Sequence, residues 1–380
     1  MTLPVVLHVL EALGGGTSKH LIDVVTHTPG FRHDVAVPRR RVGWLSDDAA
    51  VERLRDAGAG VHIVEMRREP LHPRNARALL QLRALVGSIG ADIVHGHSSI
   101  GGALARVAAA GRPVRRLYTA NGVAPGRVSR GIERALLHLT DHTIAVSESE
   151  GQLMIAAGVA RAGALTLIPN GIDLAMPASR SLHLRETLGV PGGVPLVGGL
   201  ARLVAQKGPV MFVRACGQVA ARHATAHFVL IGSGVLEPEV RREVAASGME
   251  QRFHLHPEFS SPASVLDELD VFMSTSRFEG GPYAPLEAMR AGVPVVLSDV
   301  VGNRDVVEDG VSGLIVAVDS PAGFAAAVDR LLQDGARAAT MVEAARRRLE
   351  ERFDVREMGR ATAALYASVL ATPGGSSARS

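Results

Sequence analysis

The stretch DVFMSTSRFEGGPYAPLEAMRAGVPVVLSD, residues 270–299, contains all the elements of one βαβ unit. Its opening DVFMST and its closing PVVLSD are short apolar runs of the kind that form strands. Residues 276–284 are a predicted loop, and the helix after them opens with Pro285 near its first position and closes at Gly292. Strand, loop, helix and strand in this order indicate parallel strands joined by a crossover helix.

The same alternation extends along the whole chain. Runs such as VVLHVL, DIVHGH, HTIAVS, PLVGGL and HFVLIG are predicted strands, with helices predicted between them, for example at residues 79–89 and 211–220. Because 380 residues exceed one ordinary core, we predict an α/β protein of two Rossmann-like domains that face each other across a cleft, residues 1–182 and 190–355. The boundary is expected near residues 174–193, and a helix at about 356–371 is expected to pack back on the first domain.

Composition narrows the class of protein. The single cysteine, Cys216, excludes an internal disulfide, and no apolar run approaches the ~18 residues of a membrane span. The opening MTLPVVLHVL lacks the basic start of a signal peptide, so a cytoplasmic protein is expected. The net charge of +3 hides a basic first half, which fits a solvated face, an anionic acceptor or peripheral membrane contact. No nucleic-acid partner is expected.

The loop in the opening stretch carries two carboxylates, Glu279 and Glu287, around Gly280 and Gly281. A loop at the carboxyl end of a parallel strand is where open α/β sheets bind ligands, and the amides at the start of the next helix suit a diphosphate. Carboxylates accept hydrogen bonds from ribose and sugar hydroxyls, so the combination indicates a nucleotide sugar. The alternative is a helix-capping acid and a surface acid around an ordinary turn.

A second segment, GGLARLVAQKGP at residues 198–209, follows another predicted strand and carries Arg202 and Lys207. Two cations there could neutralise a diphosphate and stabilise it as a leaving group without a divalent ion. The alternative is two solvated side chains, which is less attractive for Lys207 because only two of the 41 basic residues, Lys19 and Lys207, are lysines.

Taken together, these motifs resemble the GT-B fold retaining glycosyltransferases of family 4, the group 1 glycosyltransferases. The resemblance includes the Glu-seven residues-Glu pattern of Glu279 and Glu287, and also GGGTSKHLIDVV, DIVHGHSSIGGALARVAA, AVSESE, IPNGID, ARLVAQKG, IGSG and VEDGVSGLIV in the family's order. It implies diphosphate binding by Arg202 and Lys207 and ribose binding by Glu287. It also implies a set of residues around the transferred sugar and the donor phosphate: Gly15, Gly16, Glu279, Gly280, Gly281, Pro282 and Tyr283.

Four polar side chains of the first half, Asn121, Lys19, His95 and His97, are candidates for further roles. The segment LYTANGVAP has Asn121 where similar sequences carry a histidine; an amide can hydrogen-bond a sugar but cannot titrate near neutral pH. Lys19 and His97 are expected near the acceptor. His95 and His97 alternate at a strand end and could hold a metal, but no third ligand stands out, so a hydrogen-bonded structural role or acceptor contact is preferred.

The sequence therefore predicts a metal-independent, cofactor-free retaining glycosyltransferase, with Glu279, Arg202, Lys207 and Asn121 as catalytic residues. The expected donor is a UDP- or GDP-linked sugar, and the acceptor is a small-molecule natural product or a lipid-linked glycan. Two alternatives remain at this point: a nucleotide-sugar epimerase of the same build and a catalytically silent nucleotide-sugar-binding protein.

Overall fold

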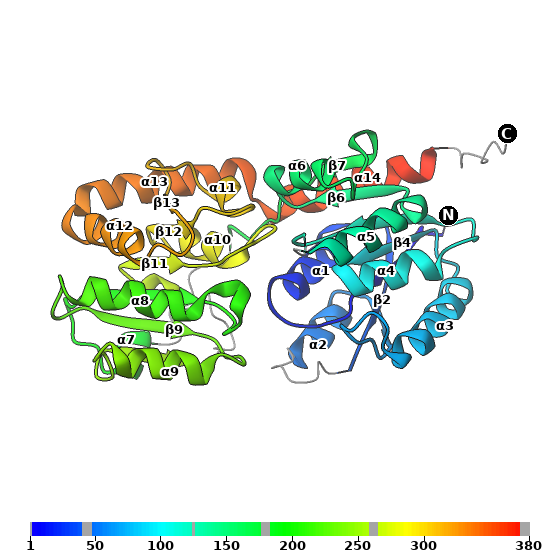
Figure 1. Cartoon of the computed structure of the whole chain (residues 1–380). Helices are drawn as coiled ribbons and strands as arrows, with labels where there is room; N and C mark the ends of the chain where they lie inside the picture. The colour runs from blue at the N-terminus through cyan, green and yellow to red at the C-terminus, as the bar shows by residue number, and fades with distance from the viewer. Residues whose placement is uncertain (1, 40–47, 124–125, 176–182, 258–264, 373–380) are drawn as a thin grey trace. The chain divides into compact units, whose positions relative to one another are not determined.

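The computed structural model describes residues 2–39, 48–123, 126–175, 183–257 and 265–372, and its contacts divide the chain into two compact units. Unit 1 comprises Met1–Gly171 and Val355–Ser380, and unit 2 comprises Ile172–Asp354. Figure 1 shows both units, each built around its own sheet. No helix among the described residues has both the length and the apolar character that crossing a membrane requires.

Unit 1 contains a seven-stranded sheet in the order β3-β2-β1-β4-β5-β6-β7, and every neighbouring pair is parallel. Its strands are β1 (Val5–Val9), β2 (Arg32–Val37), β3 (Gly60–Ile63), β4 (Ile93–His97), β5 (Arg115–Thr119), β6 (His142–Ala145) and β7 (Leu165–Leu167). Its α-helices are α1 (Gly15–His27), α2 (Asp48–Asp56), α3 (Pro73–Ser88), α4 (Ser99–Ala108), α5 (Arg127–Leu136), α6 (Glu148–Ala156) and α14 (Val355–Ala371).

Helices cover both faces of this sheet because its strands are apolar on both sides. Val6 and Ile93 pack with Val24 of α1 and Tyr366 of α14, whereas the opposite face packs against α3 and α4. The last helix approaches the end of α1 so closely that a Cβ on Gly359 would lie 2.2 Å from a carbonyl oxygen of α1. A glycine is therefore needed at position 359 for α14 to pack against the end of α1.

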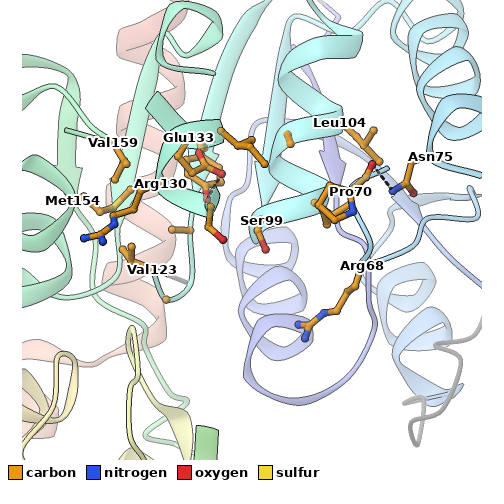
Figure 2. Close-up of a pocket in the computed structure, with 17 residues that line it drawn as sticks. Arg68, Pro70, Asn75, Ser99, Leu104, Val123, Arg130, Glu133, Met154 and Val159 are labelled. Atoms are coloured by element: carbon orange, nitrogen blue, oxygen red, sulfur yellow. Dashed lines mark hydrogen bonds between the residues drawn. The ribbon is translucent and has the colours of Figure 1, made fainter. Parts of the chain in front are cut away.

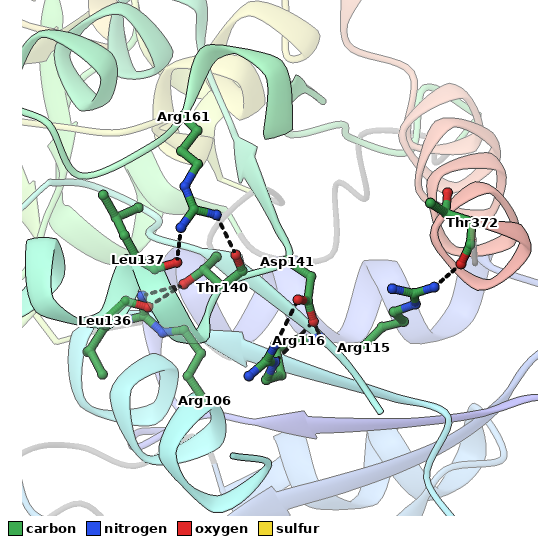
Figure 3. Close-up of polar contacts among 9 residues, drawn as sticks. All are labelled: Arg106, Arg115, Arg116, Leu136, Leu137, Thr140, Asp141, Arg161 and Thr372. Carbon is green, nitrogen blue, oxygen red and sulfur yellow. Dashed lines mark hydrogen bonds and ion pairs between the residues drawn. The ribbon is translucent and has the colours of Figure 1, made fainter. Parts of the chain in front are cut away.

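Arginine side chains of unit 1 bind residues in the connections between its strands and helices, as Figure 3 shows. Arg116 forms a two-pronged ion pair with Asp141, with N···O distances of 2.8 and 3.0 Å, and Arg161 donates to the carbonyl of Leu137 at 2.9 Å. Arg115 donates to the carbonyl of Thr372, just beyond α14. Part of the basic excess of the first half is therefore structural.

Unit 2 contains a six-stranded parallel sheet in the order β10-β9-β8-β11-β12-β13. Its strands are β8 (Leu196–Leu200), β9 (His227–Ile231), β10 (Phe253–His256), β11 (Val271–Ser274), β12 (Val295–Ser298) and β13 (Leu314–Val316). Its α-helices are α7 (Leu184–Leu188), α8 (Pro209–Ala220), α9 (Glu237–Ala246), α10 (Tyr283–Arg290), α11 (Asn303–Val306), α12 (Pro321–Gln333) and α13 (Gly335–Arg352). Cys216 is buried between α8 and the sheet.

The two-domain α/β architecture is confirmed, but the expected boundary at residues 174–193 is too late in the sequence. The chain enters unit 2 at Ile172, whose amide donates to the carbonyl of Phe353 at 2.8 Å and whose side chain is fully buried in the core of unit 2. The first domain therefore ends at residue 171 and not at 182. Three strands, β2, β3 and β10, were not predicted.

Candidate functional site

The strand order of unit 2 reverses direction between β8 and β11. Successive connections run outward from β8 through β9 to β10, and from β11 through β12 to β13, so the loops that follow β8 and β11 diverge at this point. Open parallel sheets bind ligands in the crevice that such diverging loops leave at the carboxyl ends of the strands. Arg202 and Lys207 lie on the loop after β8, and Glu279 lies on the loop after β11.

Backbone contacts fix these two loops against each other. Gly208, the N-cap of α8, has a left-handed backbone at φ 61° and lies so close to Thr275 that a Cβ would be 2.4 Å from the Thr275 carbonyl oxygen. The amide of Arg277 donates to the carbonyl of Gln206 at 2.7 Å, and the Gln206 side chain donates to the carbonyl of Phe278 at 3.1 Å. The spacing between the loops is therefore set by the fold.

This arrangement brings the Lys207 ammonium and the Glu279 carboxylate into a 2.5 Å ion pair. The Lys207 side chain is 20% exposed and the Glu279 side chain is 7% exposed. A partly buried pair of this kind stabilises each charge, and loss of one partner leaves the other desolvated. Chemically, Lys207 can bind a phosphate oxygen and Glu279 can accept a hydrogen bond from a hydroxyl.

The other residues predicted for the donor lie on the same loop and helix. Helix α10 begins at Tyr283, two residues before the expected start at Pro285, and Pro282 is its N-cap. Only Pro282 therefore separates Gly280 and Gly281 from the first-turn amides at Tyr283 and Ala284. Glu287 lies one turn further along α10 and is half-buried, as is Arg202 on the neighbouring loop.

Unit 1 has an equivalent reversal, between β1 and β4. Glu11, buried just after β1, accepts hydrogen bonds from the Ser98 hydroxyl at 2.9 Å and the Gly101 amide at 3.0 Å at the start of α4. The predicted donor residues Gly15 and Gly16 are exposed at the start of α1. Lys19, predicted at the acceptor, forms an ion pair with Asp23 one turn along α1 at 3.1 Å.

Asn121 follows β5 and has a backbone φ of 53°, in the left-handed region that asparagine tolerates better than most residues. Its side-chain nitrogen Nδ2 is buried and has no hydrogen-bond partner among the described residues. The next residue, Gly122, donates its amide to the buried carboxylate of Glu150 at 2.6 Å. Asn121 therefore occupies a conformationally demanding turn whose position Glu150 fixes.

His97 belongs to a row of buried, hydrogen-bonded imidazoles in which the donor of each hydrogen bond follows from the contacts of Thr28. The Thr28 hydroxyl donates to the carbonyl of Val24 at 2.6 Å, so it accepts from His33 Nε2 at 2.9 Å. His33 Nδ1 then accepts from His8 Nε2 at 3.0 Å, and His8 Nδ1 accepts from His97 Nε2 at 3.0 Å. All three rings are neutral in this arrangement. The last acceptor nitrogen of the row is His97 Nδ1, a buried atom without a hydrogen-bond partner among the described residues.

Two further histidines, His95 and His20, lie beside this row of imidazoles. His95 contacts the Tyr366 hydroxyl through Nδ1 at 2.7 Å and the Thr119 hydroxyl through Nε2 at 2.8 Å. His20 of α1 donates from Nδ1 to the side-chain oxygen of Asn170 at 2.9 Å. Burial lowers the pKa of His8, His95 and His97 well below 6.5 and that of His20 to about 4. The cluster is therefore uncharged at neutral pH.

The expectation that no third residue accompanies His95 and His97 is wrong, because strand pairing brings His8 beside them. Each of these three buried residues offers one ring nitrogen, and the nitrogens lie within 4.8 Å of one another. Their hydrogen bonds to one another and to Tyr366 and Thr119 engage the same rings. Because His8 came from the first strand, 87 residues before His95, spacing along the chain could not reveal it.

Unit 1 also contains a cavity of about 300 Å³ that the sequence did not predict (Figure 2). It lies among the connection before α3, the start of α4, the end of β5 and helices α5 and α6. Most of its lining is apolar, and Arg68, Arg130 and Glu133 are its charged members. No sequence signal marks it, because its lining comes from five separate segments.

Comparison with known proteins gives the family. Residues 14–176 match the model of Glycosyltransferase Family 4, and residues 194–334 match that of Glycosyl transferases group 1. The chain belongs to the group 1, or family 4, glycosyltransferases. The two matched regions carry the predicted residues of unit 1 and unit 2, respectively, so the family resemblance and the enzyme class are confirmed.

Individual members of the family are similar over most of this chain. The UDP-Gal:alpha-D-GlcNAc-diphosphoundecaprenol alpha-1,3-galactosyltransferase of Escherichia coli is 27% identical over 277 residues, which are 69% of this chain and 71% of that enzyme. The D-inositol 3-phosphate glycosyltransferase of Nocardiopsis dassonvillei is 27% identical over 357 residues, 87% of this chain and 78% of that enzyme.

A solved structure confirms the GT-B fold of this glycosyltransferase. HepE from Anabaena, crystallised in complex with UDP-glucose, superimposes with a TM-score of 0.81 over 97% of this chain and 100% of that one, at 21% identity. At this identity the likeness establishes the fold alone.

Proposed function

We propose that this glycosyltransferase transfers a sugar from a nucleoside diphosphate to an acceptor and retains the configuration at the anomeric carbon. The observation that carries the proposal is the Lys207–Glu279 ion pair at the reversal of the unit 2 sheet. A lone cation there would suit any anion, and a lone carboxylate would suit any polyol. Together they match a ligand that has a diphosphate next to a sugar.

Each residue has a role that follows from its chemistry. Lys207 and Arg202 bind the diphosphate, assisted by the first-turn amides of α10, where the helix dipole favours negative charge. Glu279 exchanges part of its contact with Lys207 for a hydroxyl of the transferred sugar, and Glu287 accepts hydrogen bonds from the ribose. Gly280 and Gly281 allow the backbone to approach the sugar because they have no side chains.

The chemical step is a displacement on one face of the sugar. The bond between the anomeric carbon and the diphosphate oxygen breaks, and the acceptor oxygen bonds to the same face. The acceptor proton passes to an oxygen of the departing diphosphate, so no protein nucleophile is required. Lys207 and Arg202 stabilise the charge that develops on the leaving group, which is where preorganised cations contribute most to catalysis.

The relatives support a nucleoside diphosphate donor, because the Escherichia coli enzyme is named for UDP-Gal and HepE was solved with UDP-glucose. We propose a UDP- or GDP-linked sugar as donor, and a small-molecule natural product or a lipid-linked glycan as acceptor. No metal or cofactor is assigned to this reaction, since the two cations and the helix amides supply the neutralisation of the diphosphate.

Thermal unfolding with a panel of UDP- and GDP-sugars tests the donor site. A donor at 100 times its dissociation constant is expected to stabilise the protein by about 2.7 kcal/mol. Lys207→Met should abolish this shift, and Arg214→Met should preserve it, because Arg214 is an exposed partner of Glu243 on another part of unit 2. Glu279→Gln combined with Lys207→Met avoids leaving a buried carboxylate without its partner.

Turnover distinguishes the proposed transfer from the two alternatives. Transfer to an acceptor with the donor's anomeric configuration in the product, read by NMR coupling constants, supports a retaining transferase. Release of an epimerised sugar without acceptor would identify an epimerase. Donor binding with neither hydrolysis nor transfer, across the acceptor classes named above, would identify a silent binding protein, and an inverted product would contradict retention.

A further inference from the structure

The loop after β11, residues 275–282, is held from a second side by residues at the end of β12, and we call it the Glu279 loop. β12 lies next to β11 in the sheet, and Ser298 is its last residue. The Ser298 hydroxyl donates to the carbonyl of Ser276 at 2.5 Å, three residues before Glu279. Ser298 is 0% exposed and Ser276 is 1% exposed, so bulk water does not compete for this hydrogen bond.

Asn303 holds the Ser298 hydroxyl in the orientation that this hydrogen bond requires. Its side-chain nitrogen Nδ2 donates to the Ser298 carbonyl at 2.9 Å and to the Ser298 hydroxyl oxygen at 3.2 Å. A carbonyl can only accept, so the single hydroxyl proton of Ser298 goes to Ser276, and Asn303 fills a lone pair of the same hydroxyl oxygen. These hydrogen bonds therefore run in one direction, from the turn after β12 to the Glu279 loop.

Gly302 brings the same turn into direct contact with the Glu279 loop. Its backbone has φ 84°, and a Cβ at this position would lie 2.5 Å from the Gly280 carbonyl oxygen and 3.3 Å from the Glu279 Cβ. The turn is itself anchored, because the Asp299 amide donates to the carbonyl of Val316 on β13 at 2.7 Å. Any larger residue in place of Gly302 would therefore displace the Glu279 loop.

We propose that Ser298, Gly302 and Asn303 are positioning residues for sugar transfer. They act on the transferred sugar through the Glu279 carboxylate and the Gly280 backbone and do not contact the sugar themselves. This inference rests on the proposed function, which assigns the transferred sugar to the Glu279 loop. A displacement of about 1 Å in a reacting geometry can lower turnover about 100-fold, so the support of this loop bears directly on catalysis.

The support should affect the sugar more than the nucleotide. The cations proposed to bind the diphosphate, Arg202 and Lys207, lie on the loop after β8, which has its own contacts to the sheet. A nucleotide sugar and its free nucleoside diphosphate share the base, ribose and diphosphate. A variant that changes the ratio of their affinities has therefore changed a contact with the sugar.

Titration calorimetry measures this ratio. The probes are the nucleotide sugar that gives the largest thermal shift with the wild-type protein and the matching nucleoside diphosphate. Ser298→Ala is expected to weaken the nucleotide sugar about tenfold and the nucleoside diphosphate less than about twofold. Ser312→Ala is the matched control, because Ser312 is a buried serine of unit 2 whose hydroxyl accepts from the Glu308 amide at 2.8 Å. It should change both affinities less than about twofold.

A pair of glycine substitutions tests the contact with the Glu279 loop. Gly302→Ala and Gly310→Ala both place alanine at a left-handed φ, 84° and 76° respectively, so both introduce backbone strain. A Cβ at Gly310 would have nothing within 4 Å, in contrast to one at Gly302. Turnover, measured as transfer or as hydrolysis of the donor, should fall about 100-fold in Gly302→Ala and less than about threefold in Gly310→Ala. Equal losses in the two variants would contradict a specific contact.

A double-mutant cycle tests whether Ser298 acts through Glu279. With Glu279→Ala in place, Ser298→Ala should weaken the nucleotide sugar by no more than about threefold, because the carboxylate that it positions has been removed. The same tenfold effect in both backgrounds would overturn the proposal, and so would equal weakening of nucleotide sugar and nucleoside diphosphate by Ser298→Ala. These results would leave the donor site standing. Absence of nucleotide-sugar binding by the wild-type protein would instead contradict the proposed function.

Discussion

The two sheets carry different kinds of polar group around the points where their strand order reverses. At the reversal of the unit 2 sheet, Lys207 and Glu279 form an ion pair on loops beyond the ends of the strands, where both side chains keep some solvent. At the reversal of the unit 1 sheet, His8, His95 and His97 lie within the strands and are fully buried. Burial of an unpaired charge is far more unfavourable than burial of a hydrogen-bonded neutral group. The polar groups within the unit 1 strands are therefore neutral imidazoles, and the buried Glu11 carboxylate beyond β1 is held by hydrogen bonds from Ser98 and Gly101.

The largest expected effect concerns the pH dependence of unit 1. The pKa of His20 is lowered from 6.5 to about 4, so between these values the unfolded chain binds a proton that the folded chain does not. The stability from this group is complete above pH 6.5, is lost as the pH falls towards 4, and amounts to about 3 kcal/mol. The buried His8, His95 and His97 add to the same loss.

Hydrogen exchange at pH 7 and pH 5 measures this difference unit by unit. Peptides from β1, β4 and α1 should lose protection at pH 5 more than peptides from β8 and β11, which serve as the internal control. His20→Gln should reduce the pH dependence, because a glutamine can still donate to Asn170 but does not titrate. Equal loss of protection in both units would contradict the contrast between the buried imidazoles of unit 1 and the ion pair of unit 2.

The second prediction is that Lys207→Ala reduces the stabilisation of the transition state by about 2 to 3 kcal/mol, which is roughly a 30- to 150-fold loss in kcat/KM. The reason is that the substitution removes the proposed charge-assisted contact to the diphosphate. Steady-state kinetics with the preferred donor measure it, with Arg214→Ala as the control. Wild-type kinetics in Lys207→Ala would exclude the diphosphate role.

The third prediction concerns Asn121, which lies in unit 1. If its amide hydrogen-bonds the donor sugar, loss of this neutral hydrogen bond raises the activation free energy of turnover by about 0.5 to 1.5 kcal/mol. Asn121→Asp should raise it further, because it places a negative charge beside the diphosphate. At φ 53°, alanine is also strained, so Asn121→Gly separates the side chain from the backbone conformation. Near-native turnover of the Gly and Asp variants at saturating donor would show that Asn121 is only a turn residue.

The smallest expected effect is that of a chelator. Turnover should be unchanged in EDTA, because in the proposed mechanism Arg202, Lys207 and the α10 amides neutralise the leaving group. The measurement matters because His8, His95 and His97 bring three ring nitrogens together. Loss of activity in EDTA that Mg²⁺ or Mn²⁺ restores would contradict metal independence. Loss of stability without loss of activity would indicate a metal ion at His8, His95 and His97.

Local patterns accounted for much of the fold. Strands such as β1, β4, β8 and β11 are short apolar runs that end in glycine-rich or polar loops, and this pattern is readable without a structure. The strand β2, with the sequence RHDVAV, was not predicted, because its polar first half hides the apolar run. β3 and β10 are four-residue strands with only two large apolar residues each, and only their pairing with neighbours defines them.

By itself, the sequence determined where a nucleotide-sugar site is predicted, because Arg202, Lys207, Glu279 and Glu287 lie in motifs after predicted strands. Only the tertiary structure decided what these side chains contact. The 2.5 Å contact of Lys207 with Glu279 joins residues 72 positions apart, and the row of imidazoles joins β1, β2 and β4. Strand order brings such residues together, and strand order depends on how whole helices and strands pack, which no local pattern encodes.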